Sequence, residues 1–451
     1  MIPVKDHYPN LIIGFGKGGK TLAAYLATQG QEVALVERSE KMYGGTCINV
    51  ACIPTKSLIT NAEKNISYED AFKIKNDLTS LLRQKNYENL ESKPLVTVID
   101  GIASFISAHE IKIIPAGNGE AKTVTADRVF INTGTEPAVP GIPGISSSKR
   151  IFTSASLMDQ SGRPNKLIIV GGGFIGLEFA DMYSKFGSDV TLLDHGNIFL
   201  PKEDRDIAHE VHKVLTARGV DIIMNASVTK VIDTDEGVVA RIRETQSGER
   251  DIEGSAILLA TGRKANTDAL NLAFAHIDTD DRGFIKVNDK LQTTADNVWA
   301  IGDVNGGPQF TYISLDDFRI IRDQLFGGDY NSISKRKLVA SSVFISPPLA
   351  HIGMREHEAK EKGYRIKIAK LPASAIPRAR IQNNTNGLLK SVVDADSNKI
   401  LGCTLFCVEA NEMINTIQVA MNAGIPYQTI RDSIFTHPSM TEAFNDLYAS
   451  I

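Results

Sequence analysis

Cysteine is scarce in this chain. Only Cys47, Cys52, Cys403 and Cys407 occur among its 451 residues. So few cysteines argue against a disulfide-stabilised secreted scaffold and favour a reducing compartment, where a cysteine pair is more often catalytic than structural. Residues 1–10 are polar and contain no apolar core of the kind that signal peptides have, so we expect no signal peptide. The expected location is the cytoplasm.

Long apolar runs and an excess of one charge are also missing. No run approaches the roughly 20 apolar residues that a membrane-spanning helix needs, and no basic cluster favours nucleic acid or a membrane surface as a partner. The net charge is −4, with 42% hydrophobic and 23% charged residues, which is ordinary for a soluble globular protein. The nine histidines form no cluster, so we predict no permanent metal site.

A glycine-rich turn near the N-terminus follows the dinucleotide-binding pattern G-x-G-x-x-G. It lies between an apolar strand and a helix, and the next strand ends in an acidic residue. The glycines allow the backbone to approach a pyrophosphate at the helix N-terminus, and the acid can accept a hydrogen bond from a ribose. This complete context predicts a dinucleotide site, which the glycines alone would not. In chain order the parts are the strand 11–13, Gly14, Gly16 and Gly19, the helix 20–29, the strand 32–36 and Glu37.

The same design recurs in the middle of the chain, which predicts a second dinucleotide site. The acid that ends its second strand favours NADH, because a carboxylate accepts a hydrogen bond from a free ribose 2′-hydroxyl and repels a 2′-phosphate. NADPH would want an arginine at this place. In chain order the parts are the strand 167–170, Gly171, Gly173 and Gly176, a helix that ends near 186, the strand 190–193 and Asp194.

A cysteine pair follows the first of these units. Cys47 and Cys52 are separated by four residues in a turn led by Gly44 and Gly45, and Pro54 is typical of a first helical turn. This spacing allows the two sulfurs to bond, and a helix N-terminus is expected to lower the pKa of a thiol there. The pair is therefore a candidate two-electron store. A structural disulfide, or two buried free thiols, is the alternative.

Three further strands end in glycine turns, as cofactor-binding strands do. Residues 129–131 lead to Thr133 and Gly134, residues 256–259 lead to Gly262, and residues 297–301 lead to Gly302 and Asp303. Asp303 at a strand end could hold a ribityl hydroxyl, although an ordinary turn aspartate looks the same. Between these units, we expect a helical stretch over 61–89 and a hairpin over 96–105 and 110–115.

The part of the chain after residue 337 has no glycine fingerprint and predicts an α+β domain. Cys403 and Cys407 lie on or beside one of its strands and are expected to pack in the core. Near the end, His437 and Glu442 can meet across a turn, where the carboxylate would fix the imidazole tautomer. The expected strands are 339–345, 365–371, 388–393 and 400–407, and the expected helices are 412–423 and 426–433.

In this order, the pieces resemble the class I pyridine nucleotide–disulfide oxidoreductases, which include glutathione reductase, dihydrolipoamide dehydrogenase and mercuric reductase. The resemblance covers essentially the whole chain. It rests on the two glycine fingerprints, on Gly44-Gly45-Thr46-Cys47-x4-Cys52, on Ala260-Thr261-Gly262, on Gly302-Asp303 and on His437-Pro-x3-Glu442. It implies FAD on the first fingerprint, NAD(P)H on the second, and a homodimer formed through the C-terminal domain.

The resemblance also implies roles for single residues. Cys52 would be the thiolate beside the flavin and Cys47 the thiol that exchanges with substrate. Lys56 would lie near the flavin and pair with Glu178. His437, held by Glu442, would serve the dithiol of the partner subunit. The implied cofactor-binding residues are Gly14, Gly16, Gly19, Glu37, Gly45, Thr46, Thr133, Gly134, Gly302 and Asp303 for FAD, and Gly171, Gly173, Gly176, Asp194 and Gly262 for the nicotinamide coenzyme.

Shorter details are similar to a subgroup of bacterial flavoproteins associated with reactive chlorine resistance. They are Met42-Tyr43, residues 309–317 and residues 376–380. That resemblance implies copper(II) as the electron acceptor. A low-molecular-weight disulfide reductase, such as dihydrolipoamide dehydrogenase, is the alternative enzyme, and a flavin-based redox sensor without sustained turnover is the alternative from another class.

The predicted fold class is therefore α/β, with two Rossmann-like domains for FAD and NAD and a C-terminal α+β dimerisation domain. We expect the FAD-binding domain to comprise residues 1–147 and a central part at 266–336. The NAD(P)H-binding domain is expected at 148–265 and the dimerisation domain at 337–451.

Overall fold

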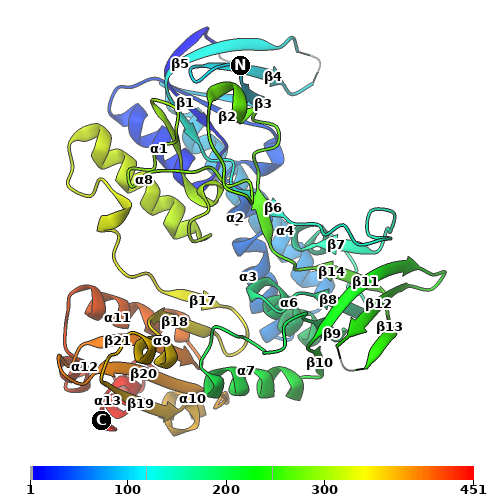
Figure 1. Ribbon diagram of the computed structural model, residues 1–451, viewed down its shortest axis with the longest axis vertical. Coiled ribbons are helices and arrows are strands. Elements are labelled where there is room, and N and C mark those ends of the chain that lie inside the picture. The colour runs from blue at the N-terminus through cyan, green and yellow to red at the C-terminus, as the bar shows by residue number, and fades with distance from the viewer. Residues whose placement is uncertain (1–3, 118, 246) are drawn as a thin grey trace. The chain divides into compact units, whose positions relative to one another are not determined.

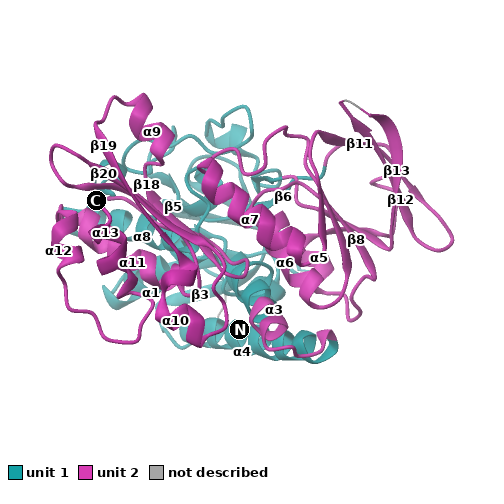
Figure 2. Cartoon of the chain, turned by 90° about the horizontal axis from the view of Figure 1, so that it is seen from below, with its two compact units in different colours: residues 1–58, 69–139, 262–336 teal, residues 59–68, 140–261, 337–451 magenta. Residues whose placement is uncertain are grey.

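A computed structural model describes residues 4–117, 119–245 and 247–451. Its chain divides into two compact units, coloured separately in Figure 2. Unit 1 comprises residues up to 58, 69–139 and 262–336, and unit 2 comprises residues 59–68, 140–261 and 337–451. Each unit contains hydrophobic cores of its own. None of the helices formed by the described residues has the length and apolarity required to cross a bilayer.

Unit 1 is built on a mixed sheet whose parallel strands lie in the order β3-β2-β1-β5-β16, while β4 pairs antiparallel with β3 and β5. Helices α1 and α8 contribute Leu22, Leu26, Phe318 and Ile321 to one core against this sheet. Because parallel strands end at one edge, the turns after β1, β5 and β16 meet there. The bounds are β1 His7–Ile13, α1 Lys17–Thr28, β2 Val33–Glu37, β3 Val96–Phe105, β4 Glu110–Pro115, β5 Lys122–Ile131, β6 Thr135–Pro137, β15 Arg263–Ala265, β16 Val298–Ala300 and α8 Thr311–Phe326.

Three helices follow the first pair of strands, and the first two of them contain the cysteines of the cysteine turn. They are α2 (Thr46–Asn49), α3 (Cys52–Glu63) and α4 (Tyr68–Glu91), labelled in Figure 1. The prediction of one helical stretch over 61–89 is wrong, because α3 and α4 are separate. Between them Asn65 adopts a φ of 56°, a left-handed conformation that ends a helix and that asparagine tolerates better than most residues.

Unit 2 begins with a second parallel sheet in the order β10-β9-β8-β14-β7. A three-stranded antiparallel sheet, β11-β12-β13, follows β10 and was not predicted. The bounds are β7 Ile151–Thr153, α5 Ser154–Met158, β8 Lys166–Val170, α6 Phe174–Lys185, β9 Asp189–Leu193, α7 Arg205–Ala217, β10 Val220–Ile223, β11 Ala226–Asp233, β12 Val238–Glu244, β13 Gly248–Gly254 and β14 Ala256–Leu259.

The C-terminal part of unit 2 is an antiparallel sheet in the order β17-β18-β21-β20-β19, with helices packed against it (Figure 1). Cys403 and Cys407 are buried in its core, as predicted. The strand predicted over 339–345 is shorter, and β18 and α13 were not predicted. The bounds are β17 Ser341–Val343, β18 Leu349–Gly353, α9 Glu356–Glu361, β19 Ile366–Pro372, α10 Pro377–Ile381, β20 Leu388–Asp394, β21 Ile400–Phe406, α11 Ala410–Asn422, α12 Tyr427–Arg431 and α13 Ala443–Ala449.

A charged cluster joins the two parts of unit 2. The Lys390 ammonium, only 3% exposed, lies 2.9 Å from Asp204 Oδ2, 3.1 Å from Asp206 Oδ1 and 2.7 Å from Glu356 Oε2. Burial alone would raise the pKa of Asp204, but hydrogen bonds from Lys390 and His357 outweigh it and lower that pKa. The ammonium is thus balanced by carboxylates from both parts.

Replacing Lys390 by methionine should destabilise the protein by about 3 kcal/mol at pH 7, because carboxylates that lose a buried partner stay charged and poorly solvated. The pKa values of Asp204, Asp206 and Glu356 are all lowered in the folded protein. The stabilisation is therefore fully present above about pH 4 and is lost as the pH falls below that value. The difference in unfolding free energy between Lys390→Met and the parent should accordingly become smaller in acid.

Urea unfolding at pH 7 and at pH 3 measures both quantities. Lys360→Met is the matched control, because Lys360 is 60% exposed and pairs with Glu356 at the surface. It should change the unfolding free energy by less than about 0.5 kcal/mol. Equal midpoints for Lys390→Met and the parent at pH 7 would contradict the assignment.

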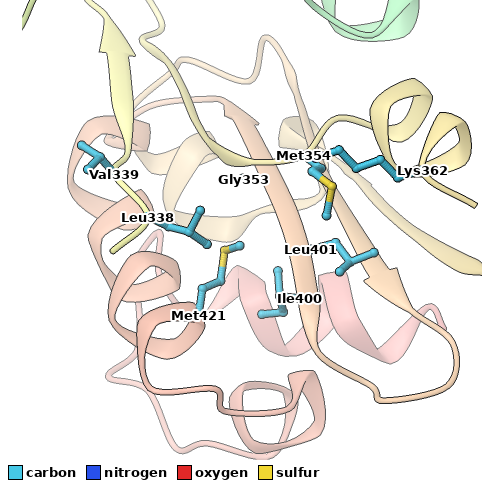
Figure 3. A pocket seen from close by; sticks show the side chains of 8 residues that line it. All are labelled: Leu338, Val339, Gly353, Met354, Lys362, Ile400, Leu401 and Met421. Carbon is cyan, nitrogen blue, oxygen red and sulfur yellow. The ribbon is translucent and has the colours of Figure 1, made fainter. Parts of the chain in front are cut away.

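An apolar pocket of about 410 Å³ lies in the C-terminal part of unit 2. Figure 3 shows the thioethers of Met354 and Met421 on its wall, and Lys362 is the one charged residue among the described residues that line it. None of the residues predicted for redox chemistry lines it. The lining residues are Leu338, Val339, Gly353, Met354, Lys362, Ile400, Leu401 and Met421.

Candidate functional site

The first glycine turn is closed by the acid that was predicted to bind a ribose. The Gly14 amide donates to Val36 O at 2.8 Å. Glu37 is buried, and its two carboxylate oxygens accept the amides of Phe15 (3.0 Å) and Ser39 (3.2 Å). Burial raises the pKa of Glu37, and the hydrogen bonds from these two backbone amides oppose the increase. Glu37 therefore shapes the turn that should receive a pyrophosphate.

Asn132, a residue that the sequence reasoning missed, clamps this turn to two neighbouring strand ends. Its Oδ1 accepts the Gly19 amide at 2.8 Å, and its Nδ2 donates to Ile301 O at 2.7 Å. A Cβ on Gly14 would lie 2.4 Å from Asn132 O, and one on Gly16 would lie 2.5 Å from Asn132 Oδ1. The glycines are thus required by packing within the protein. The available signal was a polar residue directly after an apolar strand.

The next two residues present polar groups and free space. The Thr133 hydroxyl is buried and has no hydrogen-bond partner among the described residues. Gly134 has a φ of 66°, and a Cβ there would meet nothing within 4 Å. A buried hydroxyl is rarely left unpaired, so a ligand with hydrogen-bonding groups fits here. These observations fit the FAD that the sequence predicts.

Asp303 lies at the same sheet edge in a buried polar cluster. Its Oδ2 accepts the Thr135 hydroxyl at 3.3 Å, and Thr135 in turn accepts Arg263 Nε at 2.7 Å. Burial raises the pKa of Asp303, and the Arg263 charge opposes the increase. The preceding residue, Gly302, donates its amide to Asp317 Oδ2 at 2.7 Å. Arg263, Thr135 and Asp317 were not predicted.

The cysteine turn rests directly on the first glycine turn. A Cβ on Gly45, whose φ is 84°, would lie 2.7 Å from Gly16 Cα. Thr46 begins α2, and Cys47 is its second residue, while Cys52 begins α3. The predicted FAD turn and the cysteine pair are therefore neighbours within unit 1.

Cys47 and Cys52 interact directly, and this interaction affects the pKa of Cys47. A hydrogen bond to Cys52, burial and the negative charge of Cys52 raise the pKa of Cys47 well above its usual range. This is opposite to the lowering expected at a helix N-terminus, because the neighbouring thiol dominates at Cys47. The helix that contains Pro54 begins at Cys52, and for that thiol the lowered pKa stays a prediction. Thr311 Oγ1 lies 3.6 Å from Cys52 Sγ. The arrangement therefore keeps the proton on Cys47.

The second glycine turn, in unit 2, repeats the hydrogen bonds of the first. The Gly171 amide donates to Leu193 O at 2.8 Å, and Asp194 accepts the amides of Gly172 (2.8 Å) and Gly196 (2.7 Å). A Cβ on Gly176 would lie 2.0 Å from Gly171 O. At Gly173, by contrast, a Cβ would meet nothing within 4 Å. The turn thus leaves space for a ligand at Gly173.

Three other predicted residues lie outside these two glycine turns. Glu178, on α6, is buried and accepts the Phe344 amide at 2.9 Å. Lys56 lies on the part of α3 that belongs to unit 1, so its pairing with Glu178 stays a prediction. Gly262 follows β14 and accepts the Ala138 amide at 3.0 Å, with open space at its Cβ position.

His437 and Glu442 meet near the C-terminus, as expected. His437 Nδ1 lies 2.8 Å from Glu442 Oε2, and Glu442 Oε1 accepts the Ser439 amide at 3.2 Å. The carboxylate is thus held from both sides. The imidazole is 71% exposed, so its Nε2 edge is available to another molecule.

Family models match nearly the whole chain. The pyridine nucleotide-disulphide oxidoreductase model matches residues 8–317, and the dimerisation domain of the same family matches residues 339–448. This chain belongs to that family. Its fold is accordingly the FAD- and NAD-binding Rossmann-like pair with a C-terminal dimerisation domain, as predicted.

Three relatives place this oxidoreductase within the family. It is 47% identical to the probable pyridine nucleotide-disulfide oxidoreductase RclA of Escherichia coli K12, over 99% of this chain and 100% of that protein. A mercuric reductase of Lysinibacillus sphaericus is 32% identical over 97% of this chain and 81% of its own length. A dihydrolipoyl dehydrogenase of Zymomonas mobilis is 31% identical over 98% and 97%.

One of the similar solved structures is the Cu(II) complex of RclA from Escherichia coli, which is described as an HOCl-induced flavoprotein disulfide reductase. It superposes with a TM-score of 0.95 at 45% identity and covers 99% of this chain and 100% of that one. The oxidoreductase described here is therefore a flavoprotein disulfide reductase that uses a pyridine nucleotide. The described residues contain no cluster of three or more His, Cys, Asp or Glu side chains suited to a resident metal.

Proposed function

We propose that this chain is an FAD-dependent reductase in which NADH supplies electrons, the Cys47–Cys52 pair carries them, and copper(II) accepts them during reactive chlorine stress. The observation that carries the proposal is the packing of the cysteine turn on the first glycine turn, where Gly45 approaches Gly16 Cα too closely for any side chain. The full-length similarity to RclA, solved as a Cu(II) complex, supports the acceptor.

FAD would be held by the first glycine turn, by the Thr133 hydroxyl and by Asp303. When bound, it supplies the transfer of two electrons between a nicotinamide and a thiol pair. The protein's own contribution is to keep the two sulfurs beside that site and to determine which of them holds a proton. Cys47, whose pKa is raised, would keep its proton and supply the thiol for exchange, and Cys52 would be the thiolate beside FAD.

NADH is the proposed coenzyme, and Asp194 supports this choice. Each of its oxygens accepts one backbone amide, which leaves lone pairs for a ribose hydroxyl. A 2′-phosphate at the same place would meet a carboxylate held in a fixed position and would be repelled. Running the assays below with NADPH tests this preference.

A homodimer is proposed as the working state, in the cytoplasm. The dimerisation-domain match supports it. In the dimer His437, oriented by Glu442, would move a proton for the partner subunit's dithiol.

Disulfide reduction is the second candidate, and the His437–Glu442 hydrogen bond favours it. Reduction of a disulfide produces two thiols and takes up two protons as well as two electrons, whereas reduction of copper(II) takes up electrons alone. His437→Gln should therefore slow lipoamide reduction by about 100-fold, the usual scale for a lost acid–base group, and should slow copper(II) reduction much less. Steady-state rates with each acceptor under NADH measure the ratio.

The same assay tests the acceptor itself. One NADH carries two electrons, so two copper(I) ions should appear per NADH in the presence of a copper(I)-specific chelator. Copper(II) that is not reduced, together with rapid lipoamide or glutathione disulfide turnover, would replace the copper proposal by the disulfide candidate.

A further inference from the structure

Lys20 lies in the first part of α1, one residue past the first glycine turn, and its side chain is held in one place. Its ammonium donates to Gly44 O at 3.1 Å and to Asn86 Oδ1 at 2.6 Å. The Asn86 amide is itself oriented, because its Nδ2 donates to Leu82 O at 2.7 Å. The ammonium is thus fixed between Asn86 on α4 and Gly44 in the cysteine turn. Gly44 lies three residues before Cys47 in the sequence.

The charge of Lys20 has no carboxylate to balance it. Lys20 makes no salt bridge with Asp or Glu in the described part of the chain, although burial and the neighbouring Lys17 lower its pKa to about 8. Burying an unpaired ammonium is costly unless an opposite charge forms nearby. The opposing charge that raises the pKa of Lys20 is the thiolate of Cys47.

We propose that Lys20 is an electrostatic positioning residue of the dithiol site, whose ammonium stabilises the thiolate of Cys47. This inference rests on the proposed dithiol chemistry and adds to it a cation from the same chain. No bond to Lys20 forms or breaks. When Cys47 loses its proton to a base, the pair Lys20⁺ and Cys47 S⁻ replaces a half-buried ammonium that has no carboxylate partner among the described residues.

The groups that act on Cys47 separate the effect of Lys20 from others. Cys52 raises its pKa through a hydrogen bond and through charge, whereas Thr311 and Lys20 lower it. Lys20 is therefore the cation among these groups, and Thr311 contributes only a hydroxyl. In the Cys52→Ser background the opposing thiolate is absent, so the influence of Lys20 on Cys47 can be measured alone.

The test is the pH dependence of Cys47 alkylation by iodoacetamide in the FAD-bound Cys52→Ser protein, followed by mass spectrometry of the Cys47 peptide. Lys20→Gln keeps hydrogen-bond donors for Gly44 and Asn86 but removes the charge. Loss of a neighbouring charge shifts a pKa by one unit or more, so alkylation at pH 7 should slow about tenfold and its midpoint should move to higher pH. Lys20→Arg should keep the parental midpoint.

Lys17→Gln is the matched control, because it removes a charge from the same helix that does not act on Cys47. Because Lys17 acts on Lys20 and is not among the groups that act on Cys47, this variant should move the midpoint much less than Lys20→Gln does. If Lys20→Gln does not retain FAD, Lys20→Met replaces it in the same measurement. A profile of the neutral variant that superposes on the parent, or a rate lowered equally at every pH, would overturn the inference. Because no acceptor is used, this result is independent of whether copper(II) or a disulfide is reduced.

Discussion

Replacing Cys52 by serine is expected to lower NADH-dependent reduction of the acceptor by at least about a thousandfold, the scale seen when a reacting group is removed. A hydroxyl cannot form the Cys47–Cys52 disulfide, and it does not ionise near neutral pH. Cys47→Ser should have the same effect. FAD should stay bound in both variants, because Gly14, Glu37 and Asn132 hold their turn without either sulfur.

Steady-state NADH oxidation and the flavin absorbance of the purified proteins measure these two properties. Cys403→Ala is the control, since Cys403 is buried in the core of the C-terminal part of unit 2. It should keep parental turnover. Full turnover by both Cys47→Ser and Cys52→Ser would remove the dithiol from the mechanism, whatever the acceptor.

Replacing Gly173 by valine is expected to raise the KM for NADH by about 100-fold without changing the melting temperature. Gly173 precedes α6 with φ −75° and ψ −176°, an extended conformation open to any residue. A Cβ there would meet no atom within 4 Å. The new side chain would therefore occupy only the space above the turn, where a pyrophosphate should sit on the helix N-terminus.

The contrasting variant is Gly176→Ala, three residues later on the same helix. Its Cβ would lie 2.0 Å from Gly171 O, so this small change should lower the melting temperature and the amount of folded protein. Thermal unfolding and initial rates over a range of NADH concentrations separate the two effects. A parental KM in Gly173→Val would show that the coenzyme does not bind over this turn.

The sequence was sufficient for the parts of the site that are local. The glycines of both turns, with Glu37 and Asp194, recur at fixed spacings because one strand–turn–helix segment forms each turn. The contact between His437 and Glu442 was predictable for the same reason, since only four residues separate them. The family match bears out the fold class that these local patterns indicated.

Groups that meet only through the tertiary fold were not predicted. Asn132 contacts Gly19 and Ile301, which lie 113 and 169 residues away in sequence. Lys390 meets Asp204 across an even longer separation. A single sequence carries no periodic signal for such pairs, because each partner is an ordinary polar residue in its own segment. The helix break at Asn65 was missed because one left-handed residue leaves the apolar pattern on both sides intact.

The close approach of Gly45 to Gly16 has a consequence for how this scaffold can be changed. The cofactor turn and the thiol turn meet at this contact, and neither glycine has room for a methyl group. A Cβ on Gly45 would lie 2.7 Å from Gly16 Cα, and a Cβ on Gly16 would lie 2.5 Å from Asn132 Oδ1. Variation at one glycine cannot be offset by a smaller residue at the other, since none exists. Libraries that randomise both positions should therefore return glycine at each, and new reductases based on this fold will need to graft the two turns together.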